Sequence, residues 1–319
     1  MALMADVCSV MQAKMLPVKG LGFNHSGSQI FSNLSFGNNA PTSLPCLSLR
    51  KEKQQYSNYN HNVIRIFTQQ QLSQWRLLLA PKGEIGEVCH IVLDHGGSFS
   101  FKEGQYLLVH FQSIKRYFSI ASGSSGDTFD GKTLSLCVRR AELSPDSVSN
   151  FLCNVKAGDT VDISGPFGGQ MVFDEERKMH SKHIMVATAT GVAPFRSNIQ
   201  GIFLSNILGN TDNIWLISGA DNYNSLLYDK EFIQVQNNNS DRFRYQRALN
   251  NSVDDVIYQS GDEIFKLLET GAYIYIAGSN TMLPGIKATF AKIAQERGVD
   301  WDEMLRELQS TNHWRVEVY

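Results

Sequence analysis

The segment 116–119, Arg-Tyr-Phe-Ser, combines residue types that suit a ligand with a phosphate and a flat ring. A guanidinium binds phosphate oxygens, an aromatic face stacks on a planar ring, and a hydroxyl forms a hydrogen bond at the ring edge. Because residues i and i+2 of a strand share a face, Arg116 and Phe118 are expected on one side of a strand. Taken alone, the segment is equally consistent with an ordinary strand that carries one exposed arginine.

A second segment, 187–197, reads Ala-Thr-Ala-Thr-Gly-Val-Ala-Pro-Phe-Arg-Ser and has the order of a strand, a turn and a helix. Small residues at Ala187, Ala189 and Gly191 would let the backbone approach a diphosphate. Pro194 is well suited to the first turn of a helix. The segment therefore predicts a phosphate-binding turn at the start of a helix.

Two different patterns of secondary structure must position these segments. From Trp75 to about Asp174, short alternating strands are separated by turns, with one helix expected at 147–155, which is typical of a small antiparallel barrel. From His183 onward, short apolar runs alternate with helical stretches, which predicts a doubly wound parallel sheet. The helices expected in this second half are 195–208, 228–236, 262–269, 283–297 and 302–309.

The composition sets broad limits on the class of protein. A chain of 319 residues with 42% hydrophobic and 19% charged residues is long enough for two globular domains. Its net charge of −2 argues against a nucleic-acid binder that acts through bulk charge. No apolar stretch approaches the roughly 18 residues of a membrane span. The five cysteines include no Cys-x-x-Cys pair, which favours reduced thiols, and no metal site is predicted.

The first 55 residues differ from the rest of the chain. Between Met1 and Arg50 the only acidic residue is Asp6, while serines and a few bases are scattered throughout. This composition is typical of an organelle transit peptide. The alternative is a disordered tail without a targeting role. Residues 1–55 are therefore expected to stand outside the folded domains.

In this order, and together with the C-terminal residues 314–319, Trp-Arg-Val-Glu-Val-Tyr, the motifs resemble the plant-type ferredoxin–NADP(H) reductase family. The resemblance runs from about Trp75 to Tyr319. It implies a β plus α/β fold: an antiparallel FAD-binding β-barrel at 60–174, followed by a doubly wound parallel-sheet NAD(P)-binding domain at 175–319.

The resemblance also implies an activity. The expected protein is an FAD-dependent oxidoreductase that moves electrons between ferredoxin, or a similar small carrier, and a nicotinamide nucleotide, by hydride transfer at flavin N5. The expected location is the plastid (chloroplast), in soluble or peripherally associated form. Neither a nucleic-acid partner nor a transmembrane segment is expected.

The family's site residues fall on identifiable positions of this sequence. By resemblance, Arg116 binds the FAD pyrophosphate, Phe118 lies against the isoalloxazine and Ser119 lies beside N5. Three residues are expected to be catalytic: Ser119, Glu317, which pairs with it in a proton path, and Tyr319, which covers the flavin and yields to nicotinamide. The residues expected to bind FAD or nucleotide phosphates are Arg116, Phe118, Ser119, Ile120, Cys137, Val138, Arg139, Val148, Ser149 and Tyr319. Those expected to bind NAD(P) are Thr190, Gly191, Pro194, Arg247 and Gly278.

Several positions depart from the family pattern. Phe118 replaces a tyrosine, and Ala277 replaces a cysteine at the hydride-transfer site. Where NADP-selective members hold the 2′-phosphate, this chain has Asn250, Asn251, Asp255 and Ile257, with Arg247 as a substitute cation. The expected nucleotide is NADP(H), with NAD(H) as the second option. Two alternatives stay open: a divergent NAD(P)H-dependent flavin reductase with another electron partner, and a catalytically weak FAD-binding member with a binding or assembly role.

Overall fold

The structure is a computed structural model that describes residues 61–66, 76–80, 87–141, 144, 146–173, 181–204, 213–250 and 253–319. For 61–66 and 76–80 it describes the main chain. The chain divides into two units, Met1–Gln55 and Tyr56–Tyr319, and every described residue belongs to the second unit. The predicted transit peptide and Asn251 therefore lie outside the described residues, and the domain boundaries drawn from the sequence stay predictions.

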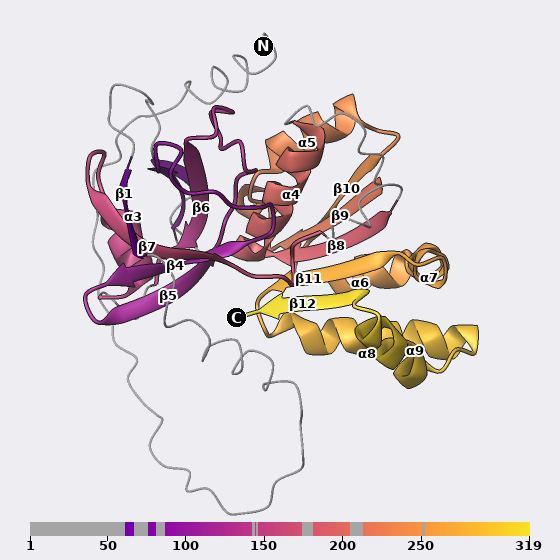
Figure 1. Ribbon diagram of the computed structural model, residues 1–319. Coiled ribbons are helices and arrows are strands. Elements are labelled where there is room, and N and C mark those ends of the chain that lie inside the picture. The colour runs from indigo at the N-terminus through magenta and orange to yellow at the C-terminus, as the bar shows by residue number, and fades with distance from the viewer. Residues whose placement is uncertain are drawn as a thin grey trace, which may run out of the picture. The chain divides into compact units, whose positions relative to one another are not determined.

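An antiparallel sheet forms the first part of the described chain (Figure 1). Its strands are β1 (His61–Ile66), β2 (Arg76–Ala80), β3 (Val88–Asp94), β4 (Tyr106–Phe111), β5 (Ile114–Ser119), β6 (Thr133–Arg139) and β7 (Thr160–Phe167). They follow the order β2-β3-β1-β7-β4-β5, and β6 pairs with β3. An antiparallel bridge between Ile120 and Leu136 brings the end of β5 to β6 and closes the sheet into a barrel. The predicted barrel is confirmed.

One helix, α3 (Val148–Asn154), packs on the barrel. Its residues Val148, Leu152 and Cys153 belong to the barrel core, and Phe151 stacks on Phe111 of β4 with ring centroids 4.3 Å apart. Burial of this apolar face stabilises a helix too short to persist alone in water. The packing fixes the start of α3 beside β5.

A five-stranded parallel sheet forms the second part. Its strands are β8 (Lys182–Thr188), β9 (Asn213–Ala220), β10 (Phe243–Leu249), β11 (Tyr273–Gly278) and β12 (Trp314–Val318), in the order β10-β9-β8-β11-β12. Every residue of β11 is buried, as expected for an interior strand covered by helices on both faces. All strands of such a sheet end at the same edge, so loops far apart in sequence meet there.

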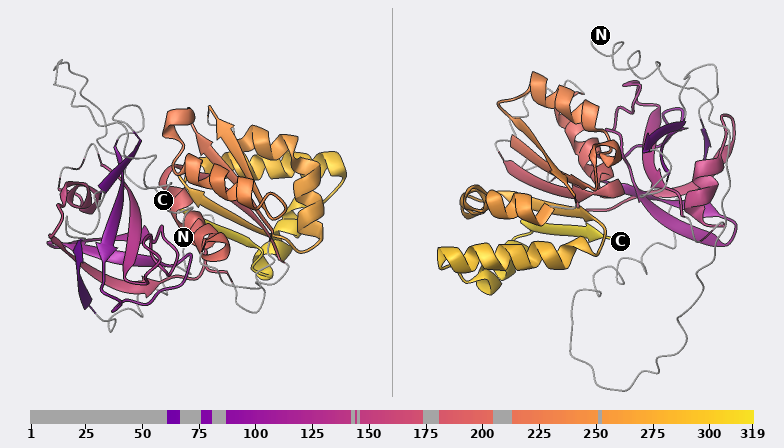
Figure 2. Two further views of the ribbon diagram at one scale, coloured as in Figure 1. Left: turned by 90° about the horizontal axis from the view of Figure 1, so that it is seen from above. Right: turned by 180° about the vertical axis from the view of Figure 1, so that it is seen from behind.

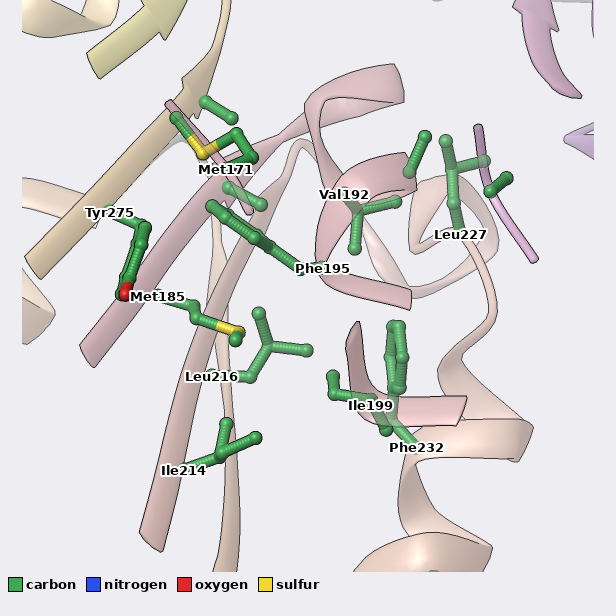
Figure 3. Packing of buried hydrophobic residues seen from close by; sticks show 14 of the residues in the cluster. Met171, Met185, Val192, Phe195, Ile199, Ile214, Leu216, Leu227, Phe232 and Tyr275 are labelled. Carbon is green, nitrogen blue, oxygen red and sulfur yellow. The ribbon is translucent and has the colours of Figure 1, made fainter. Parts of the chain in front are cut away.

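Helices cover both faces of the parallel sheet (Figures 1 and 2). The elements are η2 (Ala189–Val192), α4 (Ala193–Phe203), η3 (Tyr223–Ser225), α5 (Asp229–Asn238), α6 (Val253–Gln259), α7 (Gly261–Glu269), α8 (Met282–Arg297) and α9 (Trp301–Ser310). On one face, Phe195 of α4 and Phe232 of α5 pack on Leu216 of the sheet (Figure 3). On the other face, α6 to α9 bury a separate cluster that includes Phe265 and Phe290.

The predicted doubly wound sheet is confirmed, with two local differences. Helix α4 starts at Ala193, because Pro194 fits the first turn, and it ends at Phe203 within the described residues. Helix α6 was not predicted. Its seven residues are too few to show a clear apolar period, and the sequence places Ile257 in the predicted 2′-phosphate region.

Candidate active site

Strand β5 places Arg116 and Phe118 on one face, as the alternation predicts. The Arg116 guanidinium carbon lies 5.8 Å from the centroid of the Phe118 ring. Arg116 is exposed, whereas Phe118 is half-buried and packs against the barrel core. The strand thus presents a cation beside an aromatic ring whose position the core fixes.

Arg116 also lines a cavity of about 390 Å³ between β5 and the start of α3. Its other lining residues are Ile114, Lys115, Ser144, Asp146, Ser147 and Val148. The Ser147 side chain caps α3 by accepting a hydrogen bond from the Asn150 N–H. Of the two helix residues predicted to bind phosphate, Val148 lines the cavity, whereas Ser149 is 2% exposed and does not.

The predicted residues next to the bridge between β5 and β6 are mostly buried. Ile120 and Val138 belong to the barrel core, so only their main chains could reach a ligand. Cys137 is buried too, and burial raises the pKa of its thiol to about 12, so the thiol stays neutral at physiological pH. Arg139, by contrast, is exposed at the end of β6 and is available to a phosphate.

The predicted pair Ser119 and Glu317 is formed. The Ser119 Oγ donates a hydrogen bond of 2.9 Å to Glu317 Oε1, which joins β5 of the barrel to β12 of the parallel sheet. Burial raises the pKa of Glu317, and the hydrogen bond from Ser119 opposes part of this shift. A carboxyl group with a raised pKa exchanges protons closer to neutral pH than an ordinary glutamate.

Tyr319 follows the last residue of β12, at the edge of the parallel sheet where Glu317 meets Ser119. Its hydroxyl forms a hydrogen bond with the Thr190 hydroxyl, and its N–H donates to the Gly278 carbonyl at 3.1 Å. Although the whole residue is 57% exposed, desolvation of the phenol raises its pKa. The Thr190 bond and the charges of Arg116 and Arg139 oppose that shift, so these predicted residues act on one another electrostatically.

Two glycines allow the turn after β8 to lie against the end of β11. A Cβ added at Gly191 would stand 2.3 Å from the Ala277 carbonyl oxygen. Gly278 has φ 139°, and a Cβ added there would stand 2.4 Å from Thr188 Oγ1. Pro194 is buried in the first turn of α4, where it supports this turn. Because the backbone at Gly191 packs against β11, the side chain next to it that can reach a ligand at the predicted nicotinamide site is that of Thr190.

The predicted 2′-phosphate region has a different arrangement from the one expected. Arg247 Nε and Nη2 donate to Asp229 Oδ1 and Oδ2 at 2.6 and 3.1 Å, so its charge already has a partner. Asn250 and Asp255 are exposed. The placement of Ile257 in a phosphate site is wrong, because its side chain is fully buried between α6 and the sheet.

The sequence reasoning missed a buried polar cluster between α4 and the barrel. Arg196 is 6% exposed, and it donates to Asp127 at 2.7 Å, to Glu231 at 2.9 Å and to the Ala121 carbonyl at 2.9 Å. His90 Nε2 lies 3.3 Å from the second oxygen of Asp127. These charges fix the helix that carries the phosphate turn to the barrel. The sequence does carry a signal for this cluster. Arg196 and Gln200 are one helical turn apart, which indicates a polar face on the helix.

The described part of the chain contains neither a candidate metal site nor a helix that could span a membrane. None of its groups of histidine, cysteine, aspartate and glutamate side chains could hold a metal ion. None of its helices has the length and apolar character needed to cross a membrane.

The barrel, the doubly wound sheet and the meeting of Ser119, Glu317 and Tyr319 at one sheet edge define a class, the two-domain flavin- and nicotinamide-nucleotide-dependent oxidoreductases. Residues 185–288 match the family described as the oxidoreductase NAD-binding domain. The chain belongs to the plant-type ferredoxin–NADP reductase family.

Curated relatives show this membership. The chain is 39% identical over 308 residues to the chloroplastic ferredoxin–NADP reductase root isozyme 2 of Arabidopsis thaliana, covering 86% of this chain and 77% of the relative. It is 42% identical over 277 residues to the chloroplastic root isozyme of Oryza sativa subsp. japonica, covering 76% and 72%. Identity to the chloroplastic leaf isozyme 1 of Arabidopsis is 33% over 262 residues, covering 73% and 72%.

Solved structures share the fold. The ferredoxin–NADP⁺ reductase of Plasmodium falciparum matches with a TM-score of 0.65 at 20% identity, covering 82% of this chain and 100% of that chain. A mutant of that enzyme in complex with 2′P-AMP matches with a TM-score of 0.65 at 22% identity, covering 82% and 98%. The family resemblance, the fold class, the oxidoreductase class and the family's cofactors, FAD and NADP, are confirmed. The individual cofactor-binding residues stay predictions.

Proposed function

We propose that this protein is an FAD-dependent oxidoreductase that transfers electrons between a ferredoxin and NADP(H). The observation that carries the proposal is the hydrogen bond from Ser119 to Glu317, formed beside the contact of Tyr319 with Thr190. Together the two contacts bring the Ser119 hydroxyl, the Glu317 carboxyl group and the Tyr319 ring close to one another. The names of the relatives, all ferredoxin–NADP reductases, support the choice of electron partner and nucleotide.

The residues present fit FAD. Arg116 and Lys115 supply two cations to the cavity beside α3, against one acid, Asp146, so the balance favours a diphosphate. Phe118 offers a ring for stacking, although it lacks a hydroxyl for the ribityl chain. Bound FAD would supply the hydride and single-electron chemistry. We assign FAD to residues 60–174 and the nucleotide to 175–319.

Ser119 and Glu317 move a proton between solvent and the flavin site. Burial raises the pKa of Glu317, so its carboxylate takes up a proton more readily than an exposed one. Ser119 Oγ, which donates to Oε1 at 2.9 Å, can relay that proton toward the flavin site. Glu317 is half-buried, so it can exchange with water on one side. The pair therefore serves as a proton path.

Tyr319 competes with the nucleotide for the nicotinamide site. Its bond to Thr190 holds the ring against the residue proposed to bind nicotinamide, so ring and nucleotide compete for the same place. When the tyrosine covers the site it also excludes water. Displacement of this ring is then part of nucleotide binding.

One observation favours a second candidate function. Asp229 neutralises Arg247, the substitute cation for a 2′-phosphate, and Asp255 adds a negative charge nearby in the sequence. A site whose substitute cation is already paired gains little from the 2′-phosphate of NADPH. This arrangement would suit a divergent reductase that uses NADH and NADPH about equally, with another electron acceptor.

The deciding experiment combines a spectrum with two titrations. Purified protein should show a flavin absorption spectrum, lose it on anaerobic titration with NADPH, and sustain rapid ferredoxin-linked turnover. A protein without flavin that takes up no added FAD contradicts the proposal. Reduction by both nucleotides without ferredoxin turnover supports the divergent reductase. Bound FAD with slow reduction by either nucleotide supports a weak member with a binding role.

A plastid location is part of the proposal. The relatives are named chloroplastic, and residues 1–55 have the composition of a transit peptide. A fluorescent reporter fused to residues 1–55 should enter plastids. A reporter that stays in the cytosol contradicts this assignment without affecting the proposed reaction.

A further inference from the structure

Tyr223 is an unusually exposed aromatic residue at the edge of the sheet where the active site lies. The residue is 62% exposed, the highest value among the exposed large hydrophobic residues of the described chain. It opens η3, three residues after β9 ends at Ala220. Ligands of doubly wound sheets bind at this carboxyl edge.

The turn that carries Tyr223 is held rigidly. The Asn222 side chain accepts hydrogen bonds from the Asn224 N–H at 3.0 Å and from the Ser225 hydroxyl at 3.2 Å. Leu227, a little further on, is buried in the core under α4 and α5 (Figure 3). A fixed backbone with an exposed ring costs little conformational entropy when a ligand binds.

One side of the Tyr223 ring is occupied by a cation. The Arg247 guanidinium carbon lies 5.5 Å from the Tyr223 centroid and 5.7 Å from the Tyr245 centroid. Asp229 holds the same guanidinium through two oxygens and also accepts a hydrogen bond from the Tyr245 hydroxyl at 2.9 Å. Arg247 therefore packs against the Tyr223 ring and stabilises its position, while Asp229 pairs with its charge.

The strand register connects this group to the flavin end of the site. Arg247, Ser218, Ala187, Ala277 and Glu317 lie in one row across the five strands. Residues in register point to the same face of a sheet, so Arg247 and Glu317 share a face. Four strand spacings separate them, or about 19 Å. A dinucleotide with nicotinamide near Tyr319 would extend along the edge toward Tyr223.

We propose that Tyr223, supported by Arg247 and Asp229, is a nucleotide-binding residue that stacks on the adenine of the nicotinamide nucleotide. This inference rests on the proposed function and names the residue that holds the far end of its substrate. Stacking on a tyrosine needs a flat ring and no phosphate, so it holds NADH and NADPH alike. Stacking on Tyr223 would thus provide affinity at a site where Arg247 is already paired with Asp229.

The test measures binding to the FAD-loaded protein, with 5′-AMP and adenosine 2′,5′-bisphosphate as probes. Tyr223→Ala should weaken both by about 5- to 150-fold, the range of one base–aromatic stack. Tyr223→Phe should bind nearly as wild type. Tyr258→Ala is the matched control, because Tyr258 is 40% exposed on the same domain but is held by Lys292 and Glu296. Its affinity should not change.

Kinetics separate this inference from the proposed reaction. In Tyr223→Ala, KM should rise for NADPH and NADH by the same factor, with kcat and the flavin spectrum unchanged. Unchanged affinity for both probes overturns the stacking role, whether or not the enzyme is active. Weakening of the bisphosphate alone also overturns it, since that result would assign the site to the 2′-phosphate. Lack of ferredoxin turnover in the wild type with intact 5′-AMP binding would contradict only the proposed reaction.

Discussion

The Ser119 hydroxyl donates a 2.9 Å hydrogen bond to the Glu317 carboxylate although 198 positions separate the two residues in the chain. Ser119 ends β5 of the barrel, and Glu317 lies in β12, which pairs with β11 so that Ala277 and Glu317 are in register. The bond therefore requires both domains to be folded and docked. The proposed proton path would therefore exist only in the assembled protein.

Replacement of Glu317 by glutamine should slow hydride transfer by at least about 100-fold, the contribution of a positioned acid–base group. FAD content should not change, because Glu317 does not line the cavity beside α3 to which Arg116 belongs. Stopped-flow absorbance under anaerobic conditions measures the rate. Burial raises the pKa of Glu317, so the wild-type rate should titrate above the ordinary glutamate range, and the glutamine variant should lose this titration. Ser119→Ala removes the bond that lowers this pKa and should move the titration to still higher pH.

Tyr319→Ser should strengthen nucleotide binding by about 2- to 10-fold, because the wild-type ring must break its hydrogen bond with Thr190 before nicotinamide enters. Tyr319→Phe keeps the ring and loses the bond, so its affinity should lie between the two. Difference spectra on addition of NADP⁺ report the affinity. Equal affinities in all three proteins would show that the C-terminal tyrosine has only a structural role.

Arg116→Ala should weaken FAD binding by about 1.5–3 kcal/mol, the scale of a charged hydrogen bond. Equilibrium dialysis or quenching of flavin fluorescence measures the change. Lys132→Ala is the control, because Lys132 is an exposed cation that does not line the cavity beside α3. Equal FAD affinity in the Arg116 variant and this control would remove Arg116 from the pyrophosphate site.

Asp127→Asn should destabilise the FAD-saturated protein by about 3 kcal/mol, because it leaves the buried Arg196 without one of its carboxylates. Burial acts to raise the pKa of Asp127, but Arg196 and His90 together outweigh it and hold the pKa well below the usual range. The folded pKa is thus below the unfolded one. This stability is present above about pH 4 and is lost as the pH falls through the folded pKa.

Urea unfolding at several pH values measures that effect. The wild-type protein should lose stability below about pH 4 more steeply than Asp127→Asn, which lacks the carboxyl group. Asp130→Asn, an exposed neighbour in the same loop, should change the free energy of unfolding by less than about 1 kcal/mol. A variant at Asp127 as stable as wild type would contradict the role assigned to the buried cluster.

Asp229→Asn should release Arg247 and raise the preference for NADPH over NADH by about 10- to 150-fold, the value of one charge-assisted phosphate contact. Because Asp229 already pairs with Arg247, the wild-type preference for NADPH should be unusually weak, and Arg247→Ala should not change it. Steady-state kinetics with both nucleotides give the ratios. A strong wild-type NADPH preference that survives Arg247→Ala would place the 2′-phosphate elsewhere.

The sequence by itself determined the fold class and the candidates for the catalytic group. Alternation of apolar residues and the spacing of turns are local properties, and they predicted the barrel strands, the parallel sheet and its main helices. Short motifs with fixed residue types identified Ser119, Glu317, Tyr319 and Thr190 as candidates. The roles proposed for these residues follow from the chemistry of a hydroxyl, a carboxyl group and an aromatic ring, and residue type alone gives that chemistry.

Tertiary structure alone decided which of these groups meet and which charges are already paired. Arg247 pairs with Asp229, 18 residues away, and Arg196 reaches Asp127, 69 residues away, and no local pattern encodes either contact. The same holds for Ile257, whose burial depends on how α6 packs against the sheet. Pairing and burial are set by the approach of distant segments, and a charge has its effect only in the surroundings that this approach creates.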